Sequence, residues 1–274
     1  MPELPEVETM VREMRPALAG RRILSAQLSH IDVLRGVTRP KLLTALTGAR
    51  IHDVTRRAKH AVIHLDQHRF VLQPGMTGNL LIYDRPLTPA ESKYAVLHTR
   101  LDNGTAFVFR DVRRLGTLLL LNDRQWDAYD QALGPEPLDP ALTPERFTRE
   151  LRDSGQAIKK VIMDQRKLVG VGNIYANEAL FAAGIDPSKP ARQVPSEAWP
   201  LLFHHIRRIL QAAIDSEGTT FRDYRTATGQ PGNFQLELLV YEREGEPCTV
   251  CGTRLSGTHL IDARITVFCH RCQR

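Results

Sequence analysis

The sequence predicts an α+β fold in which a β domain, a helical domain and a small metal-bound tip follow one another. Three observations support this order. Short apolar segments separated by turn residues fill the first half, apolar residues recur at helical spacings in the second half, and the four cysteines all lie between residues 248 and 272. We expect domain boundaries near residues 135 and 234, which gives a β-sandwich domain over 1–135, a helical domain over 136–234 and a cysteine-bearing tip over 235–274.

The first predicted element is a helix over residues 3–19. Its apolar residues recur at spacings of three and four, Pro5 suits the first turn and Gly20 suits the end. Turn residues such as Asp102-Asn103-Gly104 separate the β segments that follow. The predicted strands are 23–28, 61–65, 70–72, 79–83, 95–101, 105–110 and 116–121. Many short antiparallel strands indicate a sandwich or a barrel.

A linker is predicted where proline and glycine gather, at Gly134-Pro135-Glu136-Pro137. The chain beyond it has a helical pattern, in which Gly184 can close the third helix and Ser196 can cap the fourth. The predicted helices are 144–153, 157–164, 173–183 and 196–216. Residues 235–274 are expected to form short β hairpins.

The charge balance is typical of a protein with a polyanionic partner, although many basic proteins bind none. Lys and Arg number 37 against 31 Asp and Glu, so the formal net charge is +6. Aromatic residues make up only 6% of the chain, which argues against a stacking platform for single strands. No apolar run is long enough to cross a bilayer, and Glu3, Glu6 and Glu8 stand where a secretory signal would carry basic residues. We expect a cytoplasmic, monomeric protein with no membrane partner.

The cysteines have the spacing of a structural metal site. Cys248 and Cys251 form one pair, Cys269 and Cys272 form the other, and each pair can sit on one tight turn. Two disulfides or an iron–sulfur cluster are the alternatives, but a cytoplasmic protein keeps its thiols reduced. We therefore expect one structural Zn²⁺ with a closed set of four thiolates. Four arginines against one acid in residues 248–274 make this tip a candidate for gripping phosphates, although a solvated charged surface would have the same composition.

The N-terminus carries a candidate nucleophile. Removal of Met1 would leave Pro2 with a secondary amine. Terminal amines have a pKa of about 8, which lies far below the pKa of lysine. Such an amine can attack a carbonyl-like carbon and form an iminium intermediate. Glu3 and Glu6 are close enough in sequence to serve the same site. Spacing alone favours the other interpretation, in which Pro2 starts a helix and the glutamates complement the helix dipole.

Several motifs, in order along nearly the whole chain, resemble the bacterial formamidopyrimidine-DNA glycosylase family. The first is Pro2-Glu3-Leu4-Pro5-Glu6-Val7-Glu8-Thr9, in which Leu4 favours the purine-lesion branch over the endonuclease VIII branch. The others are Arg56-Arg57-Ala58-Lys59, Gly75-Met76-Thr77-Gly78, Asp111-Val112-Arg113-Arg114-Leu115-Gly116, Gly134-Pro135-Glu136-Pro137-Leu138, Val169-Gly170-Val171-Gly172-Asn173-Ile174-Tyr175-Ala176 and the finger from Cys248 to Cys272. The resemblance implies a β-sandwich, a helix–two-turns–helix element and a zinc-finger hairpin.

The resemblance also implies the chemical roles of individual residues. Pro2 is the implied nucleophile at C1′ of the damaged nucleotide, and Glu3 is the implied proton donor to the opening sugar. Glu6 belongs to the same cluster, Lys59 contacts phosphate and assists β-elimination, and Arg264 of the finger contacts phosphates and assists δ-elimination.

The same resemblance implies contacts with the DNA. Met76, Arg113 and Leu115 match side chains that fill the gap left by the extracted base, with Leu115 in place of the usual Phe. Further implied contacts are Lys159, Asn173, Tyr175, Tyr94 and Arg222. Tyr94 and Arg222 stand where the family often has His and Lys.

We therefore expect a bifunctional DNA glycosylase and AP lyase of base excision repair that removes 8-oxoguanine and formamidopyrimidines from double-stranded DNA. Its lyase step would proceed by β,δ-elimination. Three alternatives remain open on the sequence. They are an endonuclease VIII-like preference for oxidised pyrimidines, a catalytically silent DNA-binding protein and a metal-dependent nuclease.

Overall fold

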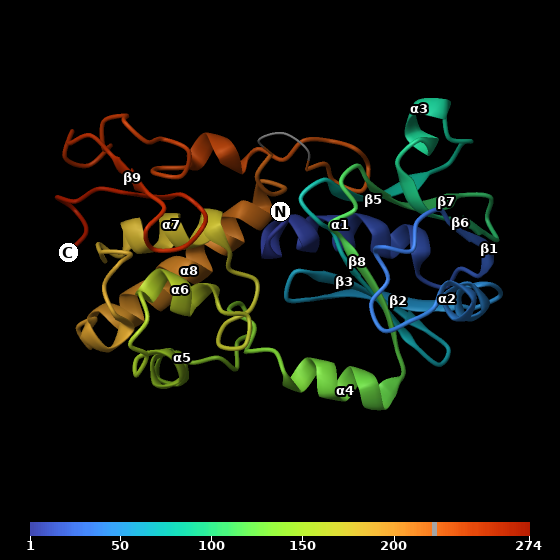
Figure 1. Cartoon of the computed structure of the whole chain (residues 1–274), viewed down its shortest axis with the longest axis horizontal. Helices are drawn as coiled ribbons and strands as arrows, with labels where there is room; N and C mark the ends of the chain where they lie inside the picture. The colour runs from blue at the N-terminus through green and yellow to red at the C-terminus, as the bar shows by residue number, and fades with distance from the viewer. Residues whose placement is uncertain (221–223) are drawn as a thin grey trace. The chain divides into compact units, whose positions relative to one another are not determined.

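The computed structural model describes residues 1–220 and 224–274, which form two compact units (Figure 1). Unit 1 comprises Met1–Gln131 and Ser216–Gln235, and unit 2 comprises Ala132–Asp215 and Leu236–Arg274. Both units mix helices with antiparallel strands, so the predicted α+β class is confirmed.

Unit 1 is built on two four-stranded antiparallel sheets. One sheet has the order β1 (Ile23–Leu28), β6 (Ala95–Leu101), β7 (Ala106–Asp111), β5 (Gly78–Tyr83). The other has the order β2 (Ile51–Arg57), β3 (His60–Leu65), β4 (Arg69–Gln73), β8 (Thr117–Leu121). Buried side chains of both sheets share one apolar core, so the open choice between sandwich and barrel resolves to a sandwich.

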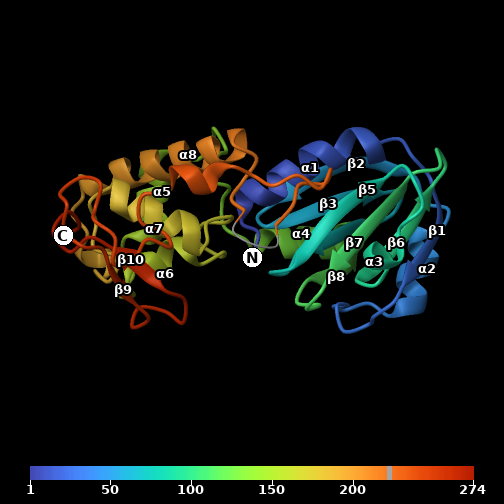
Figure 2. The ribbon, with the colours of Figure 1, turned by 90° about the horizontal axis from the view of Figure 1, so that it is seen from above.

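Helix α1 (Leu4–Leu18) supplies one edge of this core and carries the N-terminus. Val7, Met10 and Met14 are fully buried at helical spacing, and the helix packs against β2, β3 and β5 (Figure 2). Gly20 follows the helix at φ +81°, a conformation that glycine adopts without strain. The predicted helix over 3–19 is thus confirmed, and it holds the chain's first residues against the sheets.

The sequence patterns missed four elements of unit 1. They are α2 (Arg39–Leu46), β2, α3 (Pro89–Ser92) and α4 (Asp123–Gln131). Helix α4 buries none of its residues and helix α2 buries only Leu42 and Leu46, so neither has an apolar stripe to recognise. Strand β2 lies at the edge of its sheet, and its charged residues Asp53, Arg56 and Arg57 interrupt the alternation of apolar and polar residues that marks a strand.

Unit 2 contains the predicted helices and the cysteine-bearing tip. Its helices are α5 (Pro144–Leu151), α6 (Ile158–Met163), α7 (Asn173–Ala182), α8 (Ala198–Asp215) and the 3₁₀ turn η1 (Ala191–Gln193). Helix α7 contacts both α6 and α8, and Figure 2 shows it between them. Helix α8 begins at Ala198, and the Ser196 hydroxyl bonds Glu197, so the expected Ser196 cap is wrong.

The tip of unit 2 is one hairpin, β9 (Ser256–Thr258) with β10 (Thr266–Phe268). The segment that leads into it is anchored by Glu178 of α7, whose buried carboxylate accepts the backbone N–H groups of Leu239, Val240 and Tyr241 at 2.8–3.0 Å. The hairpin therefore shares contacts with the helices and belongs to the same unit.

These groupings differ from the three expected segments. Ser216–Gln235 belongs to unit 1 because the Thr219 N–H bonds the Glu6 carboxylate and the Arg225 N–H bonds Asn79. The 3₁₀ turn η2 (Phe234–Glu237) lies where the chain passes back to unit 2. Among the described residues, no helix combines the length and the apolar character needed to span a bilayer.

Candidate functional site

The N-terminus of unit 1 is surrounded by buried charged groups. Glu3 is 4% exposed and Lys59 is 5% exposed, although both residue types usually face water. Burial lowers the pKa of the Met1 α-amino group from its usual value. The carboxylates of Glu3 and Glu6 act in the opposite direction, and the positive charges of Lys59 and Arg113 act in the same direction as burial. The structure therefore brings Glu3, Glu6, Lys59 and Arg113 to bear on one amine.

Glu6 organises this cluster through its side chain. Its Oε2 accepts the Glu3 backbone N–H at 2.7 Å, which caps the start of α1. Its Oε1 accepts the Thr219 N–H at 2.9 Å, and Gly218 passes so close that a Cβ there would lie 3.1 Å from Glu6 Cγ. Both carboxylate oxygens are thus used to join α1 to the 216–220 segment.

Lys59 stands on a tight turn between β2 and β3. Arg57 pairs with His60 across the turn, which leaves Ala58 and Lys59 at its corner. Ala58 has φ +55° and is 1% exposed, a left-handed conformation that is uncommon for a residue other than glycine. The Arg56 guanidinium donates to the Ala58 carbonyl at 2.9 Å. This turn fixes the position of the lysine.

Asp111 joins two loops of unit 1, residues 74–77 before β5 and residues 112–116 after β7. Its carboxylate accepts the Thr77 hydroxyl and the Gly116 N–H, and Thr77 Oγ1 in turn accepts the Arg113 N–H at 3.0 Å. Gly75 and Gly116 allow the backbones to meet, because a Cβ on Gly75 would lie 2.5 Å from the Gly116 nitrogen.

The joined loops present apolar side chains to solvent. Met76 is 49% exposed on the first loop, and Leu115 is 55% exposed on the second loop, which also carries the exposed Arg113. The predicted trio of Met76, Arg113 and Leu115 is therefore adjacent in the structure and unburied. Tyr94 lies beside β7, with Lys93 Nζ 5.2 Å and Arg110 Cζ 5.5 Å from its ring centroid.

Unit 2 carries a second group of predicted residues around the turns between α6 and α7. Gln165 holds these turns, since its side-chain oxygen accepts the Gly170 N–H at 2.8 Å and its amide donates to the Val171 carbonyl at 3.0 Å. Gly170 has φ +82°, and the chain then enters α7 at Asn173. Helix, turns and helix follow one another as the family resemblance implied, with the N-terminus of α7 directed out of the turns.

Lys159 and Tyr175, two of the expected DNA contacts, are buried in unit 2. Lys159 is 0% exposed, and its ammonium donates to Thr266 Oγ1 at 2.6 Å and to the Ile265 carbonyl at 3.3 Å. Tyr175 is 1% exposed. Both side chains thus lie inside unit 2 in this structure, and their contact with DNA stays a prediction. Asn173, 8% exposed, likewise donates its amide to the Ile265 carbonyl at 3.1 Å.

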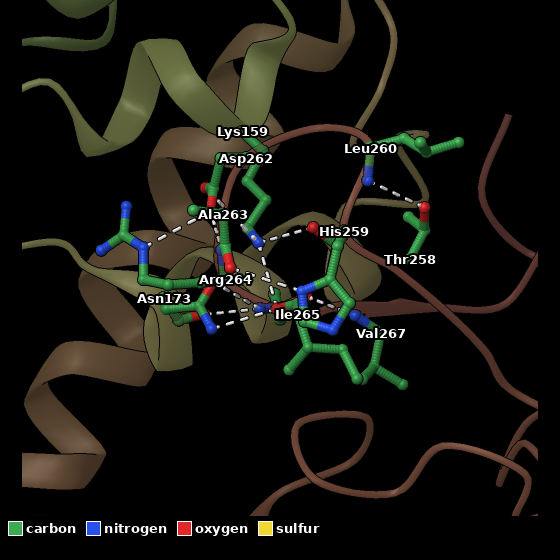
Figure 3. A network of polar contacts seen from close by, with 12 residues as sticks. Lys159, Asn173, Thr258, His259, Leu260, Asp262, Ala263, Arg264, Ile265 and Val267 are labelled. Atoms are coloured by element: carbon green, nitrogen blue, oxygen red, sulfur yellow. Dashed lines mark hydrogen bonds and ion pairs between the residues drawn. The ribbon is translucent and has the colours of Figure 1, made fainter.

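Arg264 lies on the loop between β9 and β10, in the network that Figure 3 shows. Its side chain is 52% exposed, and its Nε lies 3.4 Å from Asp262 Oδ1. Of the predicted residues in unit 2, Arg264 thus offers the most accessible charge. The predicted contact Arg222 lies outside the described residues.

The four cysteines converge as their spacing predicts. All four Sγ atoms lie within 4.8 Å of one another, with 3.9 Å between Cys248 and Cys272 and 3.5 Å between Cys251 and Cys269. All are free thiols, which removes the disulfide alternative. A tetrahedral ion with bonds of about 2.3 Å to sulfur needs thiolates about 3.8 Å apart, so this set fits one metal ion.

Comparison with known proteins identifies the family. Residues 1–118 match the formamidopyrimidine-DNA glycosylase N-terminal domain, and residues 133–225 match the formamidopyrimidine-DNA glycosylase H2TH domain. The formamidopyrimidine-DNA glycosylase of Stutzerimonas stutzeri is 42% identical over 274 residues, 100% of both chains. That of Legionella pneumophila is 38% identical over 274 residues, 100% of this chain and 98% of its own. The chain belongs to the formamidopyrimidine-DNA glycosylase family.

Solved structures of this family share the fold. The wild-type Lactococcus lactis formamidopyrimidine-DNA glycosylase, in a complex with DNA containing an N7-benzyl-Fapy-dG, has a TM-score of 0.89 at 32% identity over 100% of both chains. A complex of the Lactococcus lactis protein with DNA containing an abasic site has a TM-score of 0.89 at 31% identity over 99% of both chains. The expected family membership and fold are confirmed.

Sequence reasoning missed several buried polar residues that hold the loops of this chain in place. Asp111 and Thr77 stand inside motifs that identified the family, but nothing in their type or spacing marks them as the tie between two loops. Gln165 and Asp262 likewise act through their neighbours. The feature that marks such residues is the burial of a polar side chain beside a glycine-rich motif. Burial becomes visible only in the folded structure, so the sequence alone does not show it.

Proposed function

We propose that this protein is a bifunctional DNA glycosylase and AP lyase that removes oxidised purines from double-stranded DNA in the cytoplasm. The observation that carries the proposal is that Pro2 is buried at the start of α1 among the buried charged residues Glu3, Glu6 and Lys59, where burial also lowers the pKa of the Met1 amine that precedes it. A nucleophilic amine must be uncharged, and burial favours that form.

The proposed reaction begins after Met1 is removed, so that the Pro2 nitrogen is the terminal amine. This nitrogen attacks C1′ of the damaged nucleotide, the bond from C1′ to the base breaks with its electron pair going to the base, and the proton lost from the attacking amine neutralises the departing base. Glu3 donates a proton to the sugar ring oxygen, and the ring opens to an iminium ion. The buried Glu6 keeps Glu3 in place through the 2.7 Å bond to its backbone N–H.

The lyase step uses the electron-withdrawing iminium. Loss of a C2′ proton expels the 3′ phosphate, and a second elimination expels the 5′ phosphate. Lys59 can hold a phosphate of the damaged nucleotide through this sequence, on the rigid turn that Ala58 forms. Water then hydrolyses the remaining iminium ion and releases the amine.

The DNA contacts are proposed from exposure and chemistry. The apolar side chains of Met76 and Leu115 would fill the space that the extruded nucleotide leaves, and Arg113 would bond the unpaired opposite base. The backbone N–H groups at the start of α7 and the guanidinium of Arg264 would contact phosphates. Tyr94, held between two cations, would lie near the DNA backbone.

We propose that the metal held by the four cysteines is a structural Zn²⁺. A closed set of four thiolates leaves no coordination position for a reactant, so this ion would stabilise the finger hairpin and take no part in bond cleavage.

The proposed function is tested by excision from matched duplexes. Rates are measured on 8-oxoguanine paired with cytosine, thymine glycol paired with adenine, and a preformed abasic site, with EDTA present. We expect release of 8-oxoguanine to exceed that of thymine glycol, together with strand cleavage at the abasic site. Faster release of thymine glycol would support the endonuclease VIII-like alternative. Absence of both activities would leave a silent DNA-binding protein, and cleavage that requires Mg²⁺ would support a nuclease.

A further inference from the structure

The loop between β9 and β10 is tied to the helices of unit 2 at successive backbone positions. Asn173 and Lys159 bond the Ile265 carbonyl, and Asn177 accepts the Val267 N–H at 2.8 Å (Figure 3). These contacts position the chain from residue 265 onward. They leave Arg264, one residue earlier, to be held by another group.

That group is Asp262. Its Oδ1 accepts the Arg264 backbone N–H at 2.6 Å and lies 3.4 Å from Arg264 Nε. Its Oδ2 lies 3.8 Å from Lys159 Nζ, and the side chain is only 12% exposed. One nearly buried carboxylate thus contacts the backbone and the guanidinium of Arg264 and the buried ammonium of Lys159.

The charges explain why an acid suits this position. Lys159 is 0% exposed, and a buried ammonium is costly unless a counter-charge and hydrogen bonds compensate it. Asp262 supplies that counter-charge as an ion pair at 3.8 Å, while the hydrogen bonds of the ammonium go to Thr266 and the Ile265 carbonyl. The terminal nitrogens of Arg264 point away from Lys159, as Figure 3 shows, and its side chain remains 52% exposed.

We propose that Asp262 is a positioning residue that fixes Arg264 for contact with a DNA phosphate. The inference rests on the proposed function, because it takes the ligand of Arg264 to be DNA. Preorganisation is its physical basis, since an arginine already held in one geometry loses less conformational entropy when it binds phosphate. The proposal is incompatible with the opposite role, in which the Asp262 carboxylate would compete with a DNA phosphate for Arg264 and so weaken DNA binding.

The test measures binding to a duplex with a stable tetrahydrofuran abasic analogue at several salt concentrations. The proteins are wild type, D262A, D262N, R264A and the double variant D262A/R264A. We expect D262A and R264A each to bind about tenfold more weakly, with the salt-dependence slope reduced by about one. The double variant should bind no more weakly than R264A, because both changes remove the same contact. D262N keeps an acceptor for the Arg264 N–H and should lose about threefold.

Two controls separate positioning from general damage to the fold. E246A removes a carboxylate of unit 2 that pairs with Arg243 on the surface, and its affinity and salt slope should match wild type. Zinc content and unfolding temperature are measured for every variant. Hydrogen exchange at the Arg264 amide should be faster in D262A than in wild type and E246A, a change that needs no DNA to observe.

The outcomes distinguish this inference from the proposed function. If wild type binds the duplex while D262A binds equally or more tightly, or if the double variant loses the sum of the two single effects, the positioning role is overturned. If wild type does not prefer the abasic duplex to an undamaged one, the proposed function fails and the inference fails with it. Reduced binding of D262A with unchanged zinc content and faster Arg264 exchange supports the positioning role.

Discussion

At the scale of single residues, the position of Lys59 depends on a neighbour, Ala58, that is held in an unfavourable backbone conformation. The conformation is unfavourable because a left-handed alanine is less stable than a helical or extended one by about 1 kcal/mol. The surrounding contacts maintain it, and the benefit is a lysine fixed on a two-residue turn. Strain at a site-bearing turn is a recurrent feature of functional loops.

Substitution of Ala58 tests this turn. Ala58→Val places a β-branched side chain at φ +55° in a buried position, so we expect the free energy of unfolding to fall by about 2–3 kcal/mol and cleavage at abasic sites to slow as Lys59 shifts. Denaturant titration and a nicking assay measure both. Ala58→Gly, which suits this conformation, is the control and should retain activity. A valine variant as stable as wild type would show that the turn is not constrained.

His60, the residue after Lys59, gives the stability a pH dependence. Burial lowers its pKa from 6.5 to about 4, so the folded protein keeps this ring neutral while the unfolded chain protonates it. The unfolded state therefore binds more protons between pH 4 and 6.5, and stability falls as the pH drops through this range.

The matched variants are His60→Gln and His30→Gln, the second on an exposed histidine. Free energies of unfolding are measured from pH 7 to pH 4. Between pH 6.5 and pH 4, the free energy of unfolding of wild type and of the His30 variant should fall by up to about 1.4 kcal/mol per pH unit more than that of the His60 variant. Parallel curves for all three proteins would contradict the assigned shift.

At the scale of elements, the loops on β5 and β7 act as one body because Asp111 joins them. Asp111→Ala would leave the buried Gly116 N–H and the Thr77 hydroxyl without this acceptor, at a cost of about 2–3 kcal/mol in unfolding free energy. The wedge formed by Met76, Arg113 and Leu115 would lose its shape.

The expected result is selective for duplex DNA. A single-stranded abasic substrate has no opposite strand for the wedge to engage, so Asp111→Ala should slow cleavage of the duplex by about tenfold more than cleavage of the single strand. Asp102→Ala, on an exposed turn, is the control. Equal slowing on both substrates would indicate general destabilisation and contradict a role in holding the wedge.

The elements also show what the sequence can and cannot predict. Strands such as 95–101 and the helix over 3–19 were predictable because apolar residues repeat at the period of a buried face. Helix α4 was not, because it buries none of its residues. The cysteines were predictable from spacing, whereas the burial of Lys159 was not, since it depends on a hairpin about a hundred residues away.

At the scale of the whole molecule, the two units have separate apolar cores. The finger hairpin packs against apolar residues of unit 2. Cys248 and Cys269 pack with Phe181 of α7 and Val267 of β10. Loss of the metal should therefore release the hairpin without unfolding the sandwich of unit 1.

Cys272→Ala tests this division. We expect the variant to contain less than one zinc per chain, to exchange amide hydrogens rapidly over residues 248–274, and to bind the abasic duplex at least about tenfold more weakly. Amides of β3, β4 and β7 should keep wild-type protection, since they lie in the core of unit 1. Loss of protection there as well would contradict two separately stable units.

The central claim is that the terminal amine forms the covalent intermediate. The most direct measurement is borohydride reduction during reaction with an 8-oxoguanine duplex, followed by mass spectrometry of the digested adduct. We expect a mature chain without Met1 and a reduced linkage on the Pro2 nitrogen. A linkage on the Lys59 amine, or on any other residue, would contradict it.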